Sequence, residues 1–149
     1  MSLENLLRIG QLKEHPPDRD EIVKLLAGAD RNLIDARVTT ISPETRFYAA
    51  YLTIIQSALA ALMAHGYRPN TSRPGHHITT IQSLSLTIGL SPNRIAVLDV
   101  LRRKRNTSDY TGEDIDTAST DVCILEAARL LHEVRVWLKG YSPDLVGGG

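Results

Sequence analysis

The 149-residue sequence predicts an all-α protein, an up-and-down four-helix bundle with an additional short helix and an N-terminal helical arm. Apolar residues recur almost throughout at the spacing of amphipathic helices. Two helix starts carry the same pair of residues, Ser42-Pro43 and Ser91-Pro92, in which serine can cap the helix and proline suits its first turn. A chain of this length fits one domain, so we expect the helices to share one core.

The chain is expected to begin with a short arm and a long amphipathic helix. Residues 3–14 favour a helix that ends at His15-Pro16-Pro17, because proline disfavours the helical conformation in the residue before it. Residues 20–37 carry a single apolar stripe made of Ile22, Leu25, Leu26, Ala29, Leu33 and Ala36. We therefore assign residues 1–17 to the helical arm and residues 18–140 to the bundle.

The middle of the chain predicts a long helix, a loop and a shorter helix. The helix that opens at Ser42 is expected to end at Gly66 in a left-handed conformation, and residues 67–75 follow as a polar loop. Residues 76–89 suit a helix, although part of this segment also alternates like a strand. A helix is preferred because no second strand candidate lies nearby to pair with it.

The last two main helices flank a polar segment. The first is expected to end in the basic run 102–105, before a break at residues 106–112. The second is expected over residues 113–139, with Gly140 ending it. Residues 141–149 are rich in glycine and poor in apolar side chains, so a flexible C-terminal tail is predicted.

Composition narrows the classes of function. Seventeen basic residues balance seventeen acidic ones, so any site for nucleic acid must be a local basic surface. The longest apolar-rich stretch, residues 58–64, is far below the roughly 20 residues of a bilayer span, which predicts a cytoplasmic protein without a membrane partner. Cys123 is the single cysteine, which excludes an internal disulfide and a zinc site built on paired cysteines. His76 and His77 are neighbours in sequence and point in different directions on a helix, so they make a poor metal chelate. No cofactor and no metal are expected.

The segment with the most chemical content is Arg102-Arg103-Lys104-Arg105-Asn106-Thr107-Ser108-Asp109-Tyr110. Cations in a last helical turn are stabilised by the helix dipole by about 0.3–1 kcal/mol each, so the run can be simply a solvated helix end. Alternatively, the expected break after the run presents a guanidinium, an amide and a phenol together. Acidic residues at 109, 113, 114 and 116 can pair with the run, which makes its arginines less available to phosphates.

These residues resemble the HEPN family, whose hallmark is an arginine, a polar residue that is usually asparagine, and a histidine after a short spacer. Here the hallmark corresponds to Arg105-Asn106, with Tyr110 in the histidine's place. The resemblance covers roughly residues 42–138 and includes Gly66-Tyr67-Arg68-Pro69 and Gly75-His76-His77. It implies a homodimer that binds RNA or a nucleotide.

In HEPN members that are metal-independent ribonucleases, the arginine and histidine of two subunits meet at a dimer interface and cleave RNA with its own 2′-hydroxyl. The resemblance therefore implies Arg105, Asn106 and Tyr110 as the candidate catalytic residues. Arginine can bind phosphate as a fork, and asparagine can orient it. A phenol can donate a hydrogen bond or stack on a base, but it is a poor general base at neutral pH. With Tyr110 in place of the histidine, binding of RNA or a nucleotide is still expected, whereas proton transfer during cleavage lacks its usual group.

The candidate RNA- or nucleotide-binding residues are Arg102, Arg103, Lys104, Arg68 and His77. The pair His76-His77 can also supply a proton carrier if the fold brings it near Arg105, whereas the simpler interpretation is a solvated helix start. The resemblance further implies a toxin-like subunit of a toxin–antitoxin pair, with an antitoxin as partner or a nucleotidyltransferase that modifies Tyr110. A second hypothesis is a non-catalytic helical module for dimerisation or protein interaction.

Overall fold

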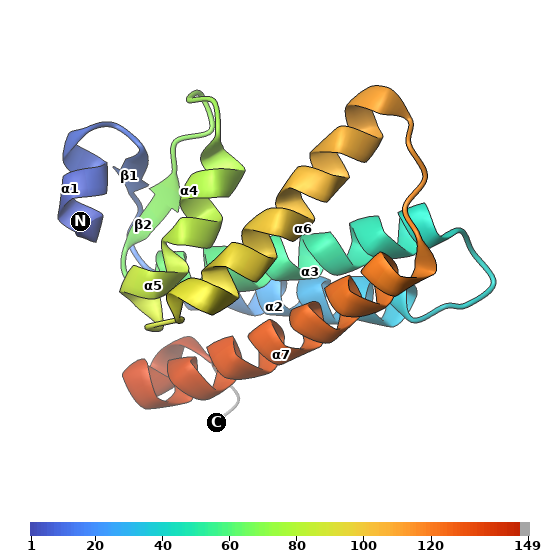
Figure 1. Cartoon of the computed structure of the whole chain (residues 1–149). Coiled ribbons are helices and arrows are strands. Elements are labelled where there is room, and N and C mark those ends of the chain that lie inside the picture. The colour runs from blue at the N-terminus through green and yellow to red at the C-terminus, as the bar shows by residue number, and fades with distance from the viewer. Residues whose placement is uncertain (147–149) are drawn as a thin grey trace.

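The computed structural model describes residues 1–146 and is helical apart from one small sheet (Figure 1). The elements are, in chain order, α1 (Leu3–Arg8), β1 (Leu12–Glu14), α2 (Arg19–Ala36), α3 (Pro43–Ala64), β2 (Tyr67–Pro69), α4 (His76–Gln82), α5 (Leu84–Thr87), α6 (Pro92–Thr111), α7 (Thr117–Tyr141) and the 3₁₀ turn η1 (Pro143–Leu145). The predicted all-helical class is therefore confirmed, with the sheet as an addition.

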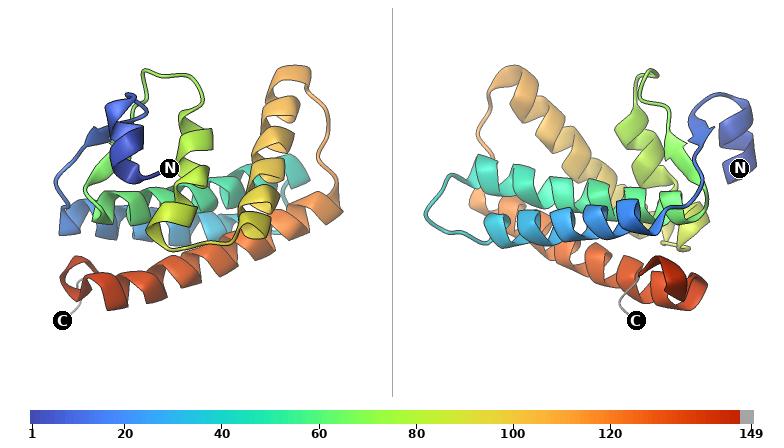
Figure 2. Two further views of the ribbon diagram at one scale, coloured as in Figure 1. Left: turned by 60° about the vertical axis from the view of Figure 1, so that its left-hand side comes forward. Right: turned by 180° about the vertical axis from the view of Figure 1, so that it is seen from behind.

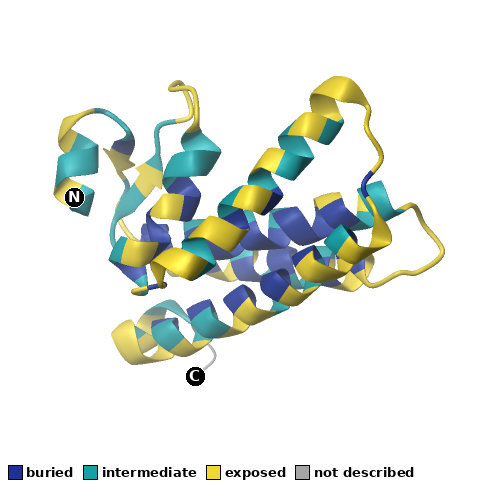
Figure 3. Ribbon diagram, in the orientation of Figure 1, coloured by how far each residue is buried: buried dark blue, intermediate teal, exposed yellow. Residues whose placement is uncertain are grey.

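Helix α3 is the centre of the fold. It packs along both α2 and α7, and Figure 3 shows that much of its surface is buried. Phe47, Tyr51 and Ile54 on this helix are fully buried. By length and composition α3 could cross a membrane, yet 72% of its most apolar window is buried inside the protein. That burial is the environment of a core helix.

Helix α6 leaves this layer of three helices at an angle. Its first turns lie near α5 and α7, and its C-terminal half extends away from the core in every view (Figures 1 and 2). Leu98 and Leu101 are the buried residues that attach it to the core. Helix α4 packs against both α3 and α6, so a histidine-bearing helix start faces the basic helix.

The predicted helix over residues 3–14 is wrong in its second half. Helix α1 ends at Arg8, and Gly10 turns the chain with a φ of +81°, which favours glycine. Residues 12–14 then form β1, antiparallel to β2, with Leu12 opposite Pro69. Leu12 is only 2% exposed, so burial together with pairing outweighs local helical periodicity. The arm over residues 1–17 is thus helix and strand, and the predicted loop 67–75 begins with a strand.

The expected break at residues 106–112 lies later, at residues 112–116. Helix α6 continues to Thr111, and Gly112, whose φ is +71°, is its C-cap. Polar residues disfavour a helix interior by less than about 0.7 kcal/mol each, which local contacts offset. One such contact joins Arg105 and Asp109, one helical turn apart. Helix α7 accordingly starts at residue 117 rather than 113, where the Asp116 carboxylate accepts a hydrogen bond from the Ser119 backbone N–H.

The C-terminal segment also differs from expectation. Gly140 lies inside α7, which ends at Tyr141, because a glycine disfavours a helix interior by only about 1 kcal/mol. The turn η1 follows, and Leu145 and Val146 pack against the core. The predicted flexible tail over 141–149 is therefore wrong up to residue 146, and residues 147–149 lie outside the described part of the chain.

Other sequence signals are confirmed. Ser42 and Ser91 each accept a hydrogen bond from the backbone N–H three residues later, as N-caps do. Gly66 has a φ of +89°, the left-handed conformation expected after α3. The segment 76–89 is helical, although it is divided into α4 and α5 at Ser83.

The central position of α3 predicts a stability difference between two isoleucines. Ile54→Ala is expected to lower the free energy of unfolding by about 2–5 kcal/mol, because it leaves a cavity in the core. Ile34 on α2 is 64% exposed, so Ile34→Ala should cost less than about 0.5 kcal/mol. Urea unfolding followed by circular dichroism measures both values. Equal losses would contradict a core built around α3.

Candidate functional site

Arg105 is held against two tyrosine rings of α3. Its guanidinium carbon lies 4.8 Å from the ring centre of Tyr48 and 5.3 Å from that of Tyr51, both within the range of cation–π attraction. The side chain is 19% exposed. Its Nε is 3.5 Å from Asp109 Oδ2, and within residues 1–146 this buried nitrogen has no hydrogen-bond acceptor. Aromatic faces therefore fix the guanidinium more firmly than the single carboxylate beside it does.

Tyr51 connects Arg105 to His77 on α4. The Tyr51 hydroxyl lies 3.0 Å from His77 Nδ1, and burial raises the pKa of this phenol, so it stays protonated. A buried hydroxyl needs an acceptor, which assigns the hydrogen bond as donated by Tyr51 to Nδ1. His77 then carries its own proton on Nε2. The second ring nitrogen is therefore a hydrogen-bond donor.

His77 is a neutral imidazole at pH 7. Burial is the main cause that lowers its pKa to about 4, and the positive charges of His76, Arg105 and Arg102 lower the pKa further. The two arginines can act in this way only because α4 lies beside α6. The fold thus brings His77 near Arg105. This proximity is what a role for the histidine pair beside Arg105 requires.

The other cations of the basic run are paired with carboxylates. Asp99, one turn earlier on α6, binds Arg102 Nε at 2.9 Å and Arg103 Nε at 3.3 Å. Lys104 Nζ lies 3.8 Å from Asp116. The expected pairing with later acidic residues therefore holds for Lys104 and Arg105, whereas Arg102 and Arg103 use an earlier one. Three carboxylates thus accompany four cations, so the run keeps a positive charge, and it lies inside α6 rather than at the end of the helix.

The expected grouping of Arg105, Asn106 and Tyr110 does not form within one chain. All three lie on one uninterrupted helix, and five residues turn an α-helix about 140° past a full turn. Tyr110 is 89% exposed, away from the tyrosine-lined face that receives Arg105. Arg68 lies on β2 opposite Lys13, with no contact that joins it to this site among residues 1–146.

The sequence alone does not identify three residues of the site, which are Tyr51, Tyr48 and Asp99. Tyr51 fits the apolar stripe of its helix, and nothing in that stripe indicates that its hydroxyl binds a histidine 26 positions later. Tyr48 lies one turn before it and is partly exposed. The spacing of Asp99 from Arg102 and Arg103 is the one signal that could have been found, because residues three and four apart on a helix are neighbours.

The buried state of His77 predicts how stability depends on pH. Between its ordinary pKa of 6.5 and its folded pKa of about 4, the unfolded chain binds a proton that the folded protein does not. The contribution of His77 to the free energy of unfolding should therefore fall as the pH is lowered through this window and level off below it. Urea unfolding at a series of pH values measures this slope.

The substitution His77→Gln should reduce that slope, because glutamine does not titrate. His132→Gln, at an exposed position of α7, is the matched control and should leave the slope unchanged. His65 contributes to the slope in every variant, because burial lowers its pKa as well. An identical slope in wild type and His77→Gln would mean that His77 is accessible to protons in the folded state.

Two further observations bear on the identity of the site. Among residues 1–146, no group of three or more His, Cys, Asp and Glu side chains is placed to hold a metal ion. No protein-family model, no curated protein and no solved structure matches the chain.

Proposed function

We propose that this protein is a HEPN-like RNA- or nucleotide-binding protein whose phosphate-binding residue is Arg105. The observation that supports the proposal most is the placement of the Arg105 guanidinium on the Tyr48 and Tyr51 rings, with His77 hydrogen-bonded to the same Tyr51. Arg105 from the motif and His77 from another helix thus both contact Tyr51. The proposal includes the four-helix HEPN-like bundle, made of α2, α3, α6 and α7, and a cytoplasmic location.

The chemistry of these groups suits an anionic ligand. A guanidinium stacked on aromatic rings keeps its planar fork in a fixed orientation, which favours bidentate binding of a phosphate. Neutral His77 adds an N–H donor at Nε2 without adding a charge. Because Asp109 contacts Arg105 at 3.5 Å, longer than a strong charged hydrogen bond, a phosphate can compete with this carboxylate.

We propose metal-independent RNA cleavage as the activity that such a site would carry. The 2′-hydroxyl attacks the adjacent phosphorus and the bond to the 5′-oxygen breaks, leaving a cyclic phosphate and a 5′-hydroxyl. Arg105 stabilises the charge that develops on the phosphate, and Asn106 orients it. Tyr110 lies on another face of α6, so it joins the reaction only in a homodimer, where it is contributed by the second subunit.

Exposed apolar residues on α6 support a homodimer and also favour a second candidate function. Val97 and Val100 are 37% and 53% exposed on this helix, and Tyr110 is exposed near its end. A helix that presents apolar side chains to solvent is a common protein-binding surface. The second candidate is therefore a non-catalytic module for dimerisation or protein interaction. The exposed Tyr110 hydroxyl is also open to modification by a partner nucleotidyltransferase, as expected of a toxin-like subunit with an antitoxin.

Binding of single-stranded RNA should depend on Arg105. Arg105→Lys keeps the charge but removes the planar fork, so the affinity is expected to fall about ten-fold or more. Arg37→Lys, at an exposed arginine after α2, is the matched control and should leave the affinity unchanged. Fluorescence anisotropy at several salt concentrations measures both. Equal affinities for the two variants would remove Arg105 from the binding site.

Cleavage separates the two candidate functions. With EDTA present, wild-type protein should shorten a mixed RNA pool, Arg105→Ala should abolish cleavage, and Tyr110→Phe should reduce it if the hydroxyl takes part. Analysis of the ends tests for the cyclic phosphate that attack by the 2′-hydroxyl leaves. Folded wild-type protein that binds no RNA and cleaves none would favour the interaction module.

A further inference from the structure

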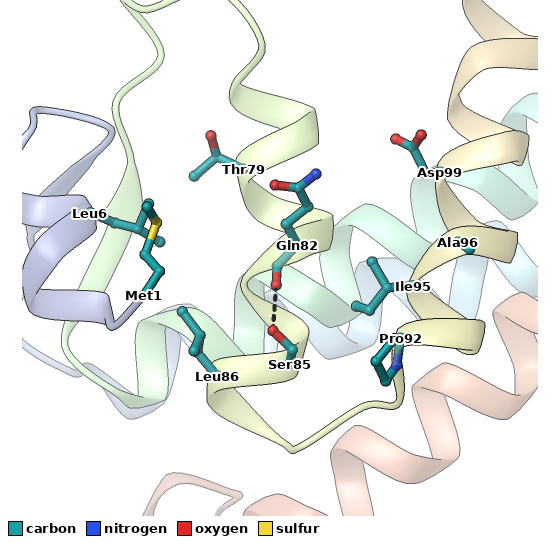
Figure 4. A pocket seen from close by; sticks show the side chains of 10 residues that line it. All are labelled: Met1, Leu6, Thr79, Gln82, Ser85, Leu86, Pro92, Ile95, Ala96 and Asp99. Carbon is teal, nitrogen blue, oxygen red and sulfur yellow. Dashed lines mark hydrogen bonds between the residues drawn. The ribbon is translucent and has the colours of Figure 1, made fainter.

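A cleft lies beside the basic site, between the same two helices. It has a volume of about 600 Å³, within the usual range of small-molecule sites, and is bounded by α1, α4, α5 and α6 (Figure 4). Leu6, Leu86 and Ile95 supply apolar walls, while Gln82 and Asp99 lie at its upper part on facing helices. An apolar slot with polar groups on one side is suited to a flat ring with a hydrogen-bonding edge.

Asp99 connects this cleft to the cations of α6. Its carboxylate lines the cleft and also binds Arg102 and Arg103. Along α6, Asp99 precedes Arg105 by about 9 Å at the helical rise of 1.5 Å per residue, and six residues also turn the helix to about 120° short of two full turns. A nucleotide that joins the cleft to Arg105 therefore has to follow the surface of α6 around the helix as well as along it. On α4, His77 precedes Gln82 by about 7.5 Å at the same rise per residue.

We propose that the cleft binds the base of a nucleotide whose phosphate contacts Arg105, and that Asp99 and Gln82 select guanine. The inference rests on the proposed function and specifies its ligand. A base fits because the apolar walls can cover its faces while its edge meets the two polar side chains. The cations next to the cleft complement the negative charge of a phosphate attached to that base.

The choice of guanine follows from the donor and acceptor capacities of these side chains. A carboxylate only accepts hydrogen bonds and has about four acceptor positions, so Asp99 keeps capacity beyond its two arginines. Guanine presents a ring N–H and an amino group side by side on its pairing edge, which matches one carboxylate. Adenine and cytosine place an acceptor next to the amino group, and uracil flanks its one N–H with carbonyls. The Gln82 amide can donate to the guanine carbonyl.

The first test is titration of the full-length protein with guanosine monophosphate, adenosine monophosphate, guanosine and inorganic phosphate, followed by calorimetry. Guanosine monophosphate should bind at least about ten-fold more tightly than phosphate and than adenosine monophosphate. Short RNAs with and without one guanosine then distinguish a free nucleotide from a residue of RNA. Equal affinities for phosphate and guanosine monophosphate would overturn the base site.

Two neighbouring positions on α6 give a matched pair of variants. Ala96 lines the cleft and is exposed, so Ala96→Trp fills the cleft without disturbing the core. Asn93 is exposed one turn earlier on α6 but does not line the cleft, and Asn93→Trp is the control. Ala96→Trp should bring guanosine monophosphate down to the affinity of phosphate alone, whereas Asn93→Trp should bind like wild type. The same affinity in both variants would overturn the proposal.

Separate ligands distinguish failure of the cleft from failure of the phosphate site. Guanosine, which has no phosphate, reports on the cleft, and phosphate with Arg105→Lys reports on the arginine. Phosphate binding that depends on Arg105, without guanosine binding, would overturn the base site and keep the proposed function. Guanosine binding that is lost in Ala96→Trp, without any effect of Arg105→Lys, would support the base site and overturn the proposed function. Asp99→Asn should reduce the preference for guanosine over adenosine monophosphate, because an amide offers a donor where the carboxylate accepts.

Discussion

Tyr51 joins the three helices on which the candidate site depends. Its ring belongs to the core through α3, one face of that ring receives the Arg105 guanidinium from α6, and its hydroxyl holds His77 on α4. Each contact constrains the others, because the cation can remain partly buried only where the rings replace some of its lost hydration. The same residue fixes which nitrogen of His77 carries the proton, while burial keeps the imidazole neutral. A single side chain therefore connects core packing to the electrostatics of the site.

The long helices could be predicted because their signals are local. The cap at Ser42, the glycine at 66 and the stripe of α2 all act within a few residues. The two strands could not, since each has three residues and is stabilised by a partner more than fifty positions away. The end of α6 was misplaced for another reason. Residues 106–111 have the composition of a loop, but weak propensities are overridden once a helix is held in place on one side.

The candidate site shows the same division between local and distant causes. Arg105 was identified by its neighbours in sequence, and the spacing of Asp99 carries a recognisable helical pairing. The environment of Arg105 comes from residues of other helices, which no local pattern specifies. His77 was a conditional candidate, and the packing of α4 on α6 meets the condition. The sequence groups Tyr110 with Arg105 because the composition of residues 106–112 predicts a loop between them, whereas a continuous helix points their side chains in different directions.

The wall of the cleft that α1 forms should open with less free energy than the core helices need. Helix α1 closes the cleft on one side, and it is joined to the body by the ribbon of β1 and β2. Two-stranded ribbons are marginal by themselves, and local opening needs less free energy than global unfolding. A ligand in the cleft would stabilise the closed arm, and a well-ordered arm would in turn raise the affinity for the ligand. Ligand binding in the cleft and ordering of the first fourteen residues are then thermodynamically coupled.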